Sequence, residues 1–334
     1  MKLLITFLLS IFLFGNSSFL SVNGTYQARN YIVMDAYTNE VLEGKDINDS
    51  YSVASISKIM TAIIALESDR LFDVIVVDDI IKTIEGSSLY LSIGDQITII
   101  DLVYGLLLRS GNDAAVLIAE NVSKDLPSFV DKMNQKASEI GLINTVFNNR
   151  SGLDIFDEGN ISSCYDMALL MSYCLNNPLF CQIINTESYK SNLKGVWSNK
   201  NKLLRQYQYC IGGKTGYTKK ARRTLINCAE KDGQKLIVVT FNCGNDFSFH
   251  KYLFEKYFNE YTYLIFLIKG KNYIADYIIY ADNQVGLRIE KSIALKGVKK
   301  YYINPITNQL KISFVTSEGE VIDGGTFDNI YAYS

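Results

Sequence analysis

Two residues at the start of a helix-forming stretch have the types and spacing needed for nucleophilic chemistry. Ser55 and Lys58 lie three positions apart, so both would project from the same face of a helix. A neutral lysine beside a serine hydroxyl can take its proton without a histidine. The tetrad alone is a weak signal, because residues 191–194 and 248–251 share its Ser-x-x-Lys spacing.

Two further motifs could complete such a site. Ser110 and Asn112, separated by one glycine, interrupt a long helical stretch, where Gly and Asn favour a break between two helices. Lys214, Thr215 and Gly216 follow a Gly-Gly pair and open a predicted strand. Ser-x-x-Lys, Ser-x-Asn and Lys-Thr-Gly, in this order, are the motif set of active-serine enzymes that recognise penicillin.

The elements that must position these motifs are strands and helices around one core. Turn residues, period-two alternation and helical spacing of apolar residues define them. In chain order we expect a hairpin (31–35 and 40–43), a buried helix (55–67), two helices within 100–120 broken at 109–112, two more helices (129–141 and 163–175), two paired strands (223–229 and 235–242), a last helix (250–261) and short strands such as 273–280 and 310–315. This order predicts an α+β fold with an antiparallel sheet covered by helices.

Composition excludes several classes of protein. The 334 residues are 48% hydrophobic and 20% charged, which is typical of a globular chain and excludes disordered and collagen-like ones. The 33 Lys and Arg residues nearly balance the 35 Asp and Glu residues. The formal charge of −2 therefore gives no bulk attraction to nucleic acid, and we expect no nucleic-acid partner.

The first residues have the pattern of an export signal. Lys2 precedes an apolar run at residues 3–14, and small polar residues follow, as in a secretory signal peptide. We expect residues 1–23 to be this signal and the protein to be extracytoplasmic, either secreted or at the outer face of the cell membrane. The run is short for a membrane-spanning helix. We expect no amphipathic helix for membrane attachment in the C-terminal tail, so a membrane tether would have to be an uncleaved signal.

The cysteines and the one histidine argue against other chemistries. The six cysteines contain no Cys-x-x-Cys pair, so we expect mostly buried free thiols and neither a metal site nor another cofactor. His250 is the only histidine, and we expect it to be an exposed or capping residue. A Gly-x-Ser-x-Gly elbow is absent from the sequence, which disfavours a Ser-His-Asp hydrolase.

With these motifs together, the chain resembles the low-molecular-weight penicillin-binding proteins, which are serine-type D-alanyl-D-alanine carboxypeptidases, over roughly residues 28–262. Two segments, 197–204 and 219–225, are most similar to the sporulation-associated branch of that family. The resemblance implies a five-stranded sheet, an all-helical subdomain and a site at their junction. The segments that carry it are residues 54–62, 85–90, 108–115, 151–153 and 213–218.

The resemblance also implies a catalytic or binding role for each motif residue. Ser55 would attack the penultimate D-Ala carbonyl of a peptidoglycan stem peptide ending in D-Ala-D-Ala, and Lys58 would take the serine's proton. Ser110 would relay a proton to the leaving amine, and Asn112 would hold Lys58 and the substrate amide. Lys214 would grip the terminal carboxylate.

The Thr215 hydroxyl would also bind the terminal carboxylate, and Gly216 would let the strand approach the ligand. The backbone amides of Ser55 and Tyr217 would form the oxyanion hole. β-Lactam antibiotics would acylate the same serine as covalent inhibitors. We expect a catalytic domain at residues 24–262 and a small β-rich region at 263–334.

Two features depart from the family pattern. Ile56 replaces a small polar residue inside the first tetrad, which would alter the pocket wall without removing a reacting group. Arg222 and Arg223 replace small residues after the Lys-Thr-Gly strand. A solvated strand end is the favoured interpretation of this pair, and contact with an anionic peptide stem is the alternative.

Two other functions stay open on the sequence alone. A β-lactamase would share the acylation residues, but class A enzymes need a glutamate that activates water. Residues 151–160 contain Asp154, Asp157 and Glu158 without the Glu-x-x-x-Asn pattern. The second alternative is a non-catalytic module that binds penicillin or cell-wall peptide.

Overall fold

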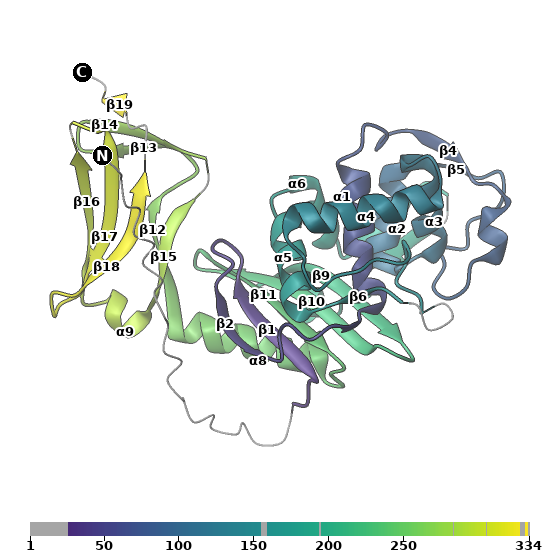
Figure 1. Cartoon of the computed structure of the whole chain (residues 1–334), viewed down its shortest axis with the longest axis horizontal. Coiled ribbons are helices and arrows are strands. Elements are labelled where there is room, and N and C mark those ends of the chain that lie inside the picture. Colours follow the sequence, from purple (N-terminus) through teal and green to yellow (C-terminus); the bar gives the residue numbers. More distant parts are fainter. Residues whose placement is uncertain are drawn as a thin grey trace, which may run out of the picture.

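A five-stranded antiparallel sheet forms the centre of the molecule (Figure 1). The computed structural model describes residues 26–154, 159–193, 195–282, 284–304, 306–327 and 331–332. The predicted signal at residues 1–23 therefore lies outside the described residues, as do Asp157 and Glu158. The strand order is β2-β1-β11-β10-β9, with β1 at Asn30–Asp35, β2 at Val41–Lys45, β9 at Cys210–Thr218, β10 at Arg222–Lys231 and β11 at Gln234–Phe241.

The two faces of this sheet carry two separate hydrophobic cores, as period-two alternation requires. Ile32 and Met34 of β1 pack on one face with the buried helix α1 (Lys58–Leu66). Val33, between them, packs on the other face with the last long helix, α8 (Asp246–Glu260). The sheet is thus a layer between helices, and β9 at its edge remains accessible from the side.

The remaining helices of the first core lie on the right of Figure 1, and the sheet separates them from the C-terminal region on the left. A short 3-10 turn, η1 (Ala54–Ser57), leads into α1. Side-chain caps begin several helices, such as Thr98, which accepts a hydrogen bond from the Asp101 amide at the start of α2. The helices are α2 (Ile99–Arg109), α3 (Asn112–Val122), α4 (Leu126–Ile140), α5 (Cys164–Cys174) and α6 (Pro178–Ile184), with a second 3-10 turn η2 (Asp79–Thr83). The short helix α7 (Leu203–Gln206) packs in the second core, with α8.

Three short strand pairs lie among the described residues before β9, and a β-rich region follows α8. The pairs are β3 (Tyr51–Ser52) with β6 (Ile161–Ser162), β4 (Val74–Val76) with β5 (Gln96–Thr98), and β7 (Ser188–Ser191) with β8 (Gly195–Ser198). The C-terminal elements are β12 (Tyr261–Leu267), β13 (Gly270–Ile274), β14 (Tyr277–Ala281), β15 (Val285–Glu290), α9 (Lys291–Ala294), β16 (Val298–Asn304), β17 (Gln309–Val315), β18 (Val321–Phe327) and β19 (Tyr331–Ala332).

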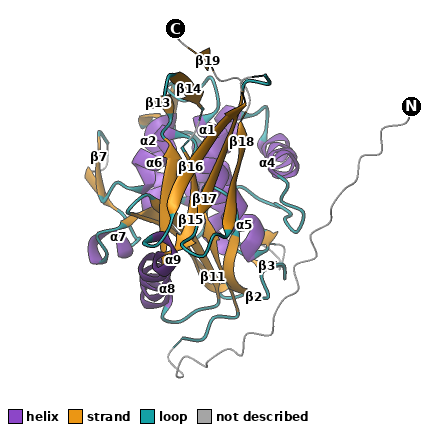
Figure 2. Cartoon of the chain, turned by 90° about the vertical axis from the view of Figure 1, so that its left-hand side faces the viewer, coloured by secondary structure: helices purple, strands orange, loops and turns teal. Residues whose placement is uncertain are grey.

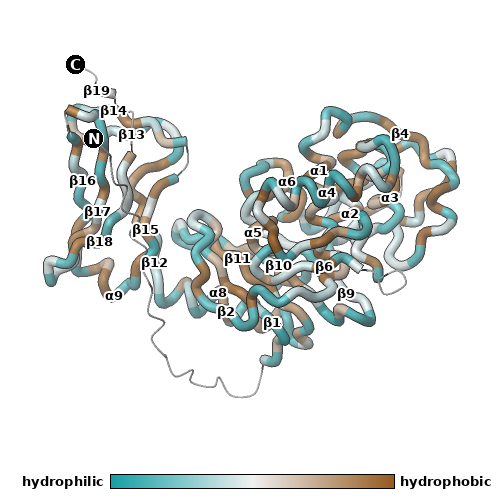
Figure 3. The backbone as a smooth tube through the Cα atoms, in the orientation of Figure 1, coloured by the Kyte–Doolittle hydropathy of each residue, from teal (hydrophilic) through white to brown (hydrophobic). Residues whose placement is uncertain are grey.

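The C-terminal region has its own small core. Figure 2 shows β16, β17 and β18 side by side, and their inward side chains, such as Ile312 and Phe314, cluster with Phe266 of β12. Hydrophobic stretches, brown in Figure 3, occur here as well as in the helical part. Contacts back to the first part include an ion pair between Arg288 and Glu40 at 2.9 Å.

The predicted fold class and the broken helix are confirmed. Ser110 ends α2 in the left-handed conformation with φ of 66°, and α3 begins two residues later. Two boundaries were wrong: Lys214 lies inside β9 rather than at its start, and α8 begins at Asp246 rather than at residue 250. The expected single strand at residues 273–280 is also wrong, because a turn at residues 275–276 divides it between β13 and β14. All six cysteines are free thiols, and five of them are buried.

Among the described residues, no single helix has the length and apolar character to cross a membrane, although α5 and α6 taken together as a bent pair have both.

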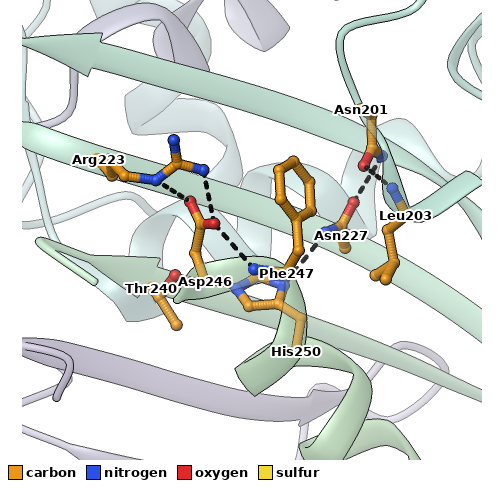
Figure 4. Close-up of polar contacts among 8 residues, drawn as sticks. All are labelled: Asn201, Leu203, Arg223, Asn227, Thr240, Asp246, Phe247 and His250. Carbon is orange, nitrogen blue, oxygen red and sulfur yellow. Dashed lines mark hydrogen bonds and ion pairs between the residues drawn. The ribbon is translucent and has the colours of Figure 1, made fainter. Parts of the chain in front are cut away.

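His250 is buried, which contradicts the expectation of an exposed or capping residue. Its position in the first turns of α8 faces the sheet, and its side chain is fully inaccessible to solvent. The Asn227 amide donates to Nδ1 at 3.3 Å, so Nε2 carries the proton and donates to Thr240 Oγ1 at 2.9 Å (Figure 4). Burial lowers the pKa of His250 to about 3.

This burial predicts an acid-sensitive fold. The unfolded chain binds a proton at this histidine below about pH 6.5, whereas the folded chain does not until about pH 3. Stability should therefore fall with decreasing pH across this window, by about 2–3 kcal/mol at pH 4.5 from this group. Denaturant unfolding of wild type and His250→Gln at about pH 7 and 4.5 checks this. An equal loss of stability in both proteins would contradict the prediction.

Candidate active site

The first motif is assembled as its spacing predicts. Ser55 lies in the η1 turn and Lys58 begins α1, and the Lys58 Nζ contacts the Ser55 Oγ at 2.9 Å. The lysine is fully buried, whereas Ser55 is partly exposed and lines a cleft. The hydroxyl can therefore meet a ligand while the amine stays shielded from water.

The second hydrogen-bond partner of Lys58 is a backbone carbonyl. The Lys58 Nζ donates to the Ser151 carbonyl oxygen at 2.5 Å. Asn160 fixes this segment, because its amide donates both to Ser57 Oγ at 2.9 Å and to the Asn149 carbonyl at 2.8 Å. Residues 151–153 were noted in the sequence as a family segment, but a backbone contact leaves no side-chain signal that could have predicted this role.

The second and third motifs meet across the boundary between the helices and the sheet. Lys214, in the edge strand β9, donates from Nζ to Ser110 Oγ at 3.0 Å and to the Thr215 carbonyl at 2.7 Å. Its side chain is 1% exposed. The left-handed turn at Ser110 is what directs this hydroxyl out of the helices toward β9.

Burial and nearby positive charges lower the pKa of both lysines. Burial lowers the pKa of Lys58 well below its usual value, and the neighbouring charges of Lys214 and Lys200 lower it further. Burial, and then the charge of Lys200, lowers the pKa of Lys214 to about 7. Lys58 can therefore be neutral near physiological pH, as a base beside a serine must be.

Gly216 allows a close approach between β9 and the serine turn. A Cβ on this residue would lie 3.1 Å from the backbone nitrogen of Ser55 and 2.3 Å from Thr224 Oγ1. Thr224 in turn donates to the Val53 carbonyl at 3.0 Å, which ties β10 to the same turn. The Ser55 amide and the strand that carries Tyr217 are thus neighbours, as an oxyanion hole formed by these two residues requires.

Asn112 lies beside the site but does not make the predicted contact with Lys58. Its amide donates to the Glu85 carbonyl at 2.6 Å, and its backbone N–H donates to the Ser87 carbonyl at 2.7 Å. The side-chain oxygen Oδ1 is buried and has no hydrogen-bond partner among the residues that the structure describes. A buried amide oxygen without a partner is available to accept from a ligand.

A cleft of about 620 Å³ opens in front of Ser55, Ser110 and strand β9, whereas Asn112 lines a different pocket of about 380 Å³. Its lining includes Ser55, Ser110, Thr215 and Tyr217, together with Lys200, whose Nζ contacts Ser87 Oγ at 3.1 Å. No role was predicted for Lys200, although it lies within residues 197–204, which are similar to the sporulation-associated branch of the family. In the described part of the chain, no group of three or more His, Cys, Asp or Glu side chains is placed to hold a metal ion.

Comparisons with known proteins agree with this geometry. A family model described as D-alanyl-D-alanine carboxypeptidase, peptidase S11, matches residues 18–245. D-alanyl-D-alanine carboxypeptidase DacF of Bacillus subtilis is 30% identical over 90% of this chain and 84% of that protein.

Two solved structures are similar as well. A D-alanyl-D-alanine carboxypeptidase from Mycobacterium tuberculosis is 31% identical, with a TM-score of 0.66 over 69% of this chain and 90% of that one. Penicillin binding protein 5 from Haemophilus influenzae, at 23% identity, shares the fold over 92% of this chain and 98% of that one, with a TM-score of 0.74. The family model covers well over half of the sequence and includes all three motifs, and the chain belongs to the D-alanyl-D-alanine carboxypeptidase family, peptidase S11.

Proposed function

We propose that this protein hydrolyses the terminal D-alanine from peptidoglycan stem pentapeptides through an acyl-serine intermediate. The observation that carries the proposal is the contact of 2.9 Å between Ser55 Oγ and the buried amine of Lys58. Family membership and the names of the relatives support the same activity. We further propose that penicillins acylate the same serine.

In the first step, Ser55 Oγ attacks the carbonyl carbon of the penultimate D-Ala, and neutral Lys58 takes the hydroxyl proton. The backbone amides of Ser55 and Tyr217 stabilise the negative oxygen that forms. The C–N bond then breaks, and the proton reaches the leaving amine of D-Ala through Ser110. Ser110 suits this role because its hydroxyl contacts Lys214 Nζ at 3.0 Å.

In the second step, water hydrolyses the acyl ester and regenerates the serine. The remaining residues hold the substrate in both steps. Lys214 and the Thr215 hydroxyl bind the terminal carboxylate, and this anion would in turn favour the charged form of Lys214. Gly216 admits the substrate backbone, and Asn112 binds the substrate amide through its unpartnered oxygen.

The wider setting of the enzyme follows from the same proposal. Peptidoglycan is extracytoplasmic, which agrees with the export signal predicted at residues 1–23. We propose residues 24–262 as the catalytic domain and residues 263–334 as the β-rich C-terminal region. We propose a role in cell-wall or spore-wall maturation, and the similarity of residues 197–204 and 219–225 to the sporulation-associated branch is compatible with either wall.

The two alternatives, a β-lactamase and a non-catalytic binding module, are not favoured by the comparisons. They differ from the carboxypeptidase in what happens to the acyl-enzyme. Mass spectrometry after mixing with benzylpenicillin should detect a stable penicilloyl adduct. Rapid turnover of penicillin would favour the β-lactamase, and stable acylation without release of D-Ala from diacetyl-Lys-D-Ala-D-Ala would favour the binding module.

Replacement of the nucleophile gives the first functional prediction. Ser55→Ala should reduce D-Ala release by at least about a thousandfold, since no acyl-enzyme can form, and should abolish labelling by a fluorescent penicillin. Ser248→Ala is the matched control, because Ser248 also begins a Ser-x-x-Lys tetrad and lines the same cleft but has no assigned part in the reaction. Labelling of the Ser55→Ala protein would contradict the assignment.

The lowered pKa of Lys58 gives a second prediction. Only the neutral amine can accept a proton, so the acylation rate should rise with pH and level off well below pH 10.5, the ordinary lysine value. The measurement is the second-order rate of penicillin labelling between about pH 5 and 10. Lys58→Arg, which stays charged throughout this range, should not be acylated. A rate that continues to rise up to about pH 10 would show that Lys58 is not the base.

A further inference from the structure

An ion pair fixes an arginine at the rim of the catalytic cleft (Figure 4). Arg223 of β10 contacts Asp246 through two bonds, from Nε to Oδ2 at 3.0 Å and from Nη2 to Oδ1 at 2.7 Å. Asp246 is 2% exposed, begins α8 and also accepts from the Phe247 amide at 2.8 Å. Such a two-point contact fixes the plane of the guanidinium as well as its position.

The free edge of this guanidinium is available to a ligand. Nε and Nη2 bind Asp246, and Nη1 has no hydrogen-bond partner among the residues that the structure describes. The Arg223 side chain is 45% exposed, compared with 4% for that of Asp246. The carboxylate therefore lies behind the arginine, and the arginine faces the cleft.

The strand register places Arg223 on the same side of the sheet as Thr215. Arg223 pairs with Tyr217, and Thr215 pairs with Leu225, two residues further along β10. Residues in this diagonal relation share a face and lie about 7–8 Å apart. A carboxylate held by the Thr215 hydroxyl would thus be within reach of the long Arg223 side chain.

The charges that line the cleft favour an anion. Its lining contains the cations Lys200, Lys202 and Arg223, and Asp246 is the one carboxylate among its described lining residues. Both oxygens of Asp246 are already bound to Arg223. The cleft therefore carries net positive charge in a chain whose formal charge is −2.

We propose that Arg223 binds the C-terminal carboxylate of the substrate together with Thr215 and Lys214, and that Asp246 is a positioning residue that presents the guanidinium. This inference rests on the proposed function and adds a specificity-determining residue to it. The favoured interpretation of the Arg222–Arg223 pair as a solvated strand end then holds only for Arg222, because the strand directs neighbouring side chains to opposite faces.

The test compares a substrate that has the carboxylate with one that lacks it. For each protein we would measure kcat and KM on diacetyl-Lys-D-Ala-D-Ala and on its C-terminal amide. Arg223→Gln should reduce the acid-to-amide ratio of kcat/KM about tenfold to a hundredfold, mainly through KM, as expected for one charge-assisted hydrogen bond. The ratio is independent of the fraction of folded enzyme, so a partly unstable variant still gives an answer.

Two further variants complete the experiment. Arg222→Gln is the matched control, since it removes the same charge from the next position without changing the lining of the cleft, and its ratio should equal that of wild type. Asp246→Asn should lower the ratio less than Arg223→Gln does. The proposal would be overturned if Arg223→Gln left the ratio unchanged, or if Arg222→Gln lowered it equally. The positioning role of Asp246 would be overturned if Asp246→Asn left the ratio unchanged.

Failure of the proposed function is distinguishable from failure of this inference. If wild type releases neither D-Ala from the acid nor D-alaninamide from the amide, the carboxypeptidase assignment fails. Acylation by benzylpenicillin and by its methyl ester then supplies the same comparison, because the ester blocks the carboxylate. The inference is supported if wild type is acylated faster by the free acid than by the ester and Arg223→Gln removes this difference. It is overturned if the difference survives the substitution.

Discussion

The structure depends on the burial of two lysine side chains next to each other. Lys58 and Lys214 are almost completely removed from solvent, and within the described residues their hydrogen bonds run to hydroxyl and carbonyl oxygens rather than to carboxylates. An ammonium group in such a place loses hydration without gaining an ion pair, so the neutral form is favoured. The same arrangement that makes Lys58 a base is therefore unfavourable for its charged form, and the surrounding fold has to hold it in place.

That support comes from contacts that are themselves neutral and well satisfied. Asn160 connects the Ser151 segment to the η1 turn, and Thr224 connects β10 to the residue before that turn. The absence of a side chain at Gly216 lets β9 lie directly against the serine. These contacts join segments that are distant in the sequence, so the geometry of the reacting atoms depends on the whole core rather than on one loop.

Much of this could be predicted from the sequence where the signal is local. The Ser55–Lys58 contact follows from helical spacing, and the break at Ser110 follows from Gly and Asn in a helical stretch. The five-stranded sheet and the helical part came from the family resemblance carried by the motifs, not from periodicity alone.

The features that the sequence could not reveal depend on which side of an element faces the core. His250 belongs to a helix whose start was placed too late, and its polar side chain gave no hint that it lies against Asn227 and Thr240. The Ser151 carbonyl has no side-chain signature. The contact between Arg223 and Asp246 joins a strand to a helix 23 residues later, and charge pattern alone does not specify such a pair.

The bond between Ser110 and Lys214 has a mechanical consequence. It lies at the seam where the helical layer meets the sheet, and the cleft runs along this seam with lining residues from both layers. A reversibly bound ligand that contacts both Ser55 and Thr215 would connect the two layers. Because such a ligand binds only when both layers are in place, its binding increases the free energy of unfolding by mass action. The catalytic cleft is thus also a place where a ligand stabilises the fold.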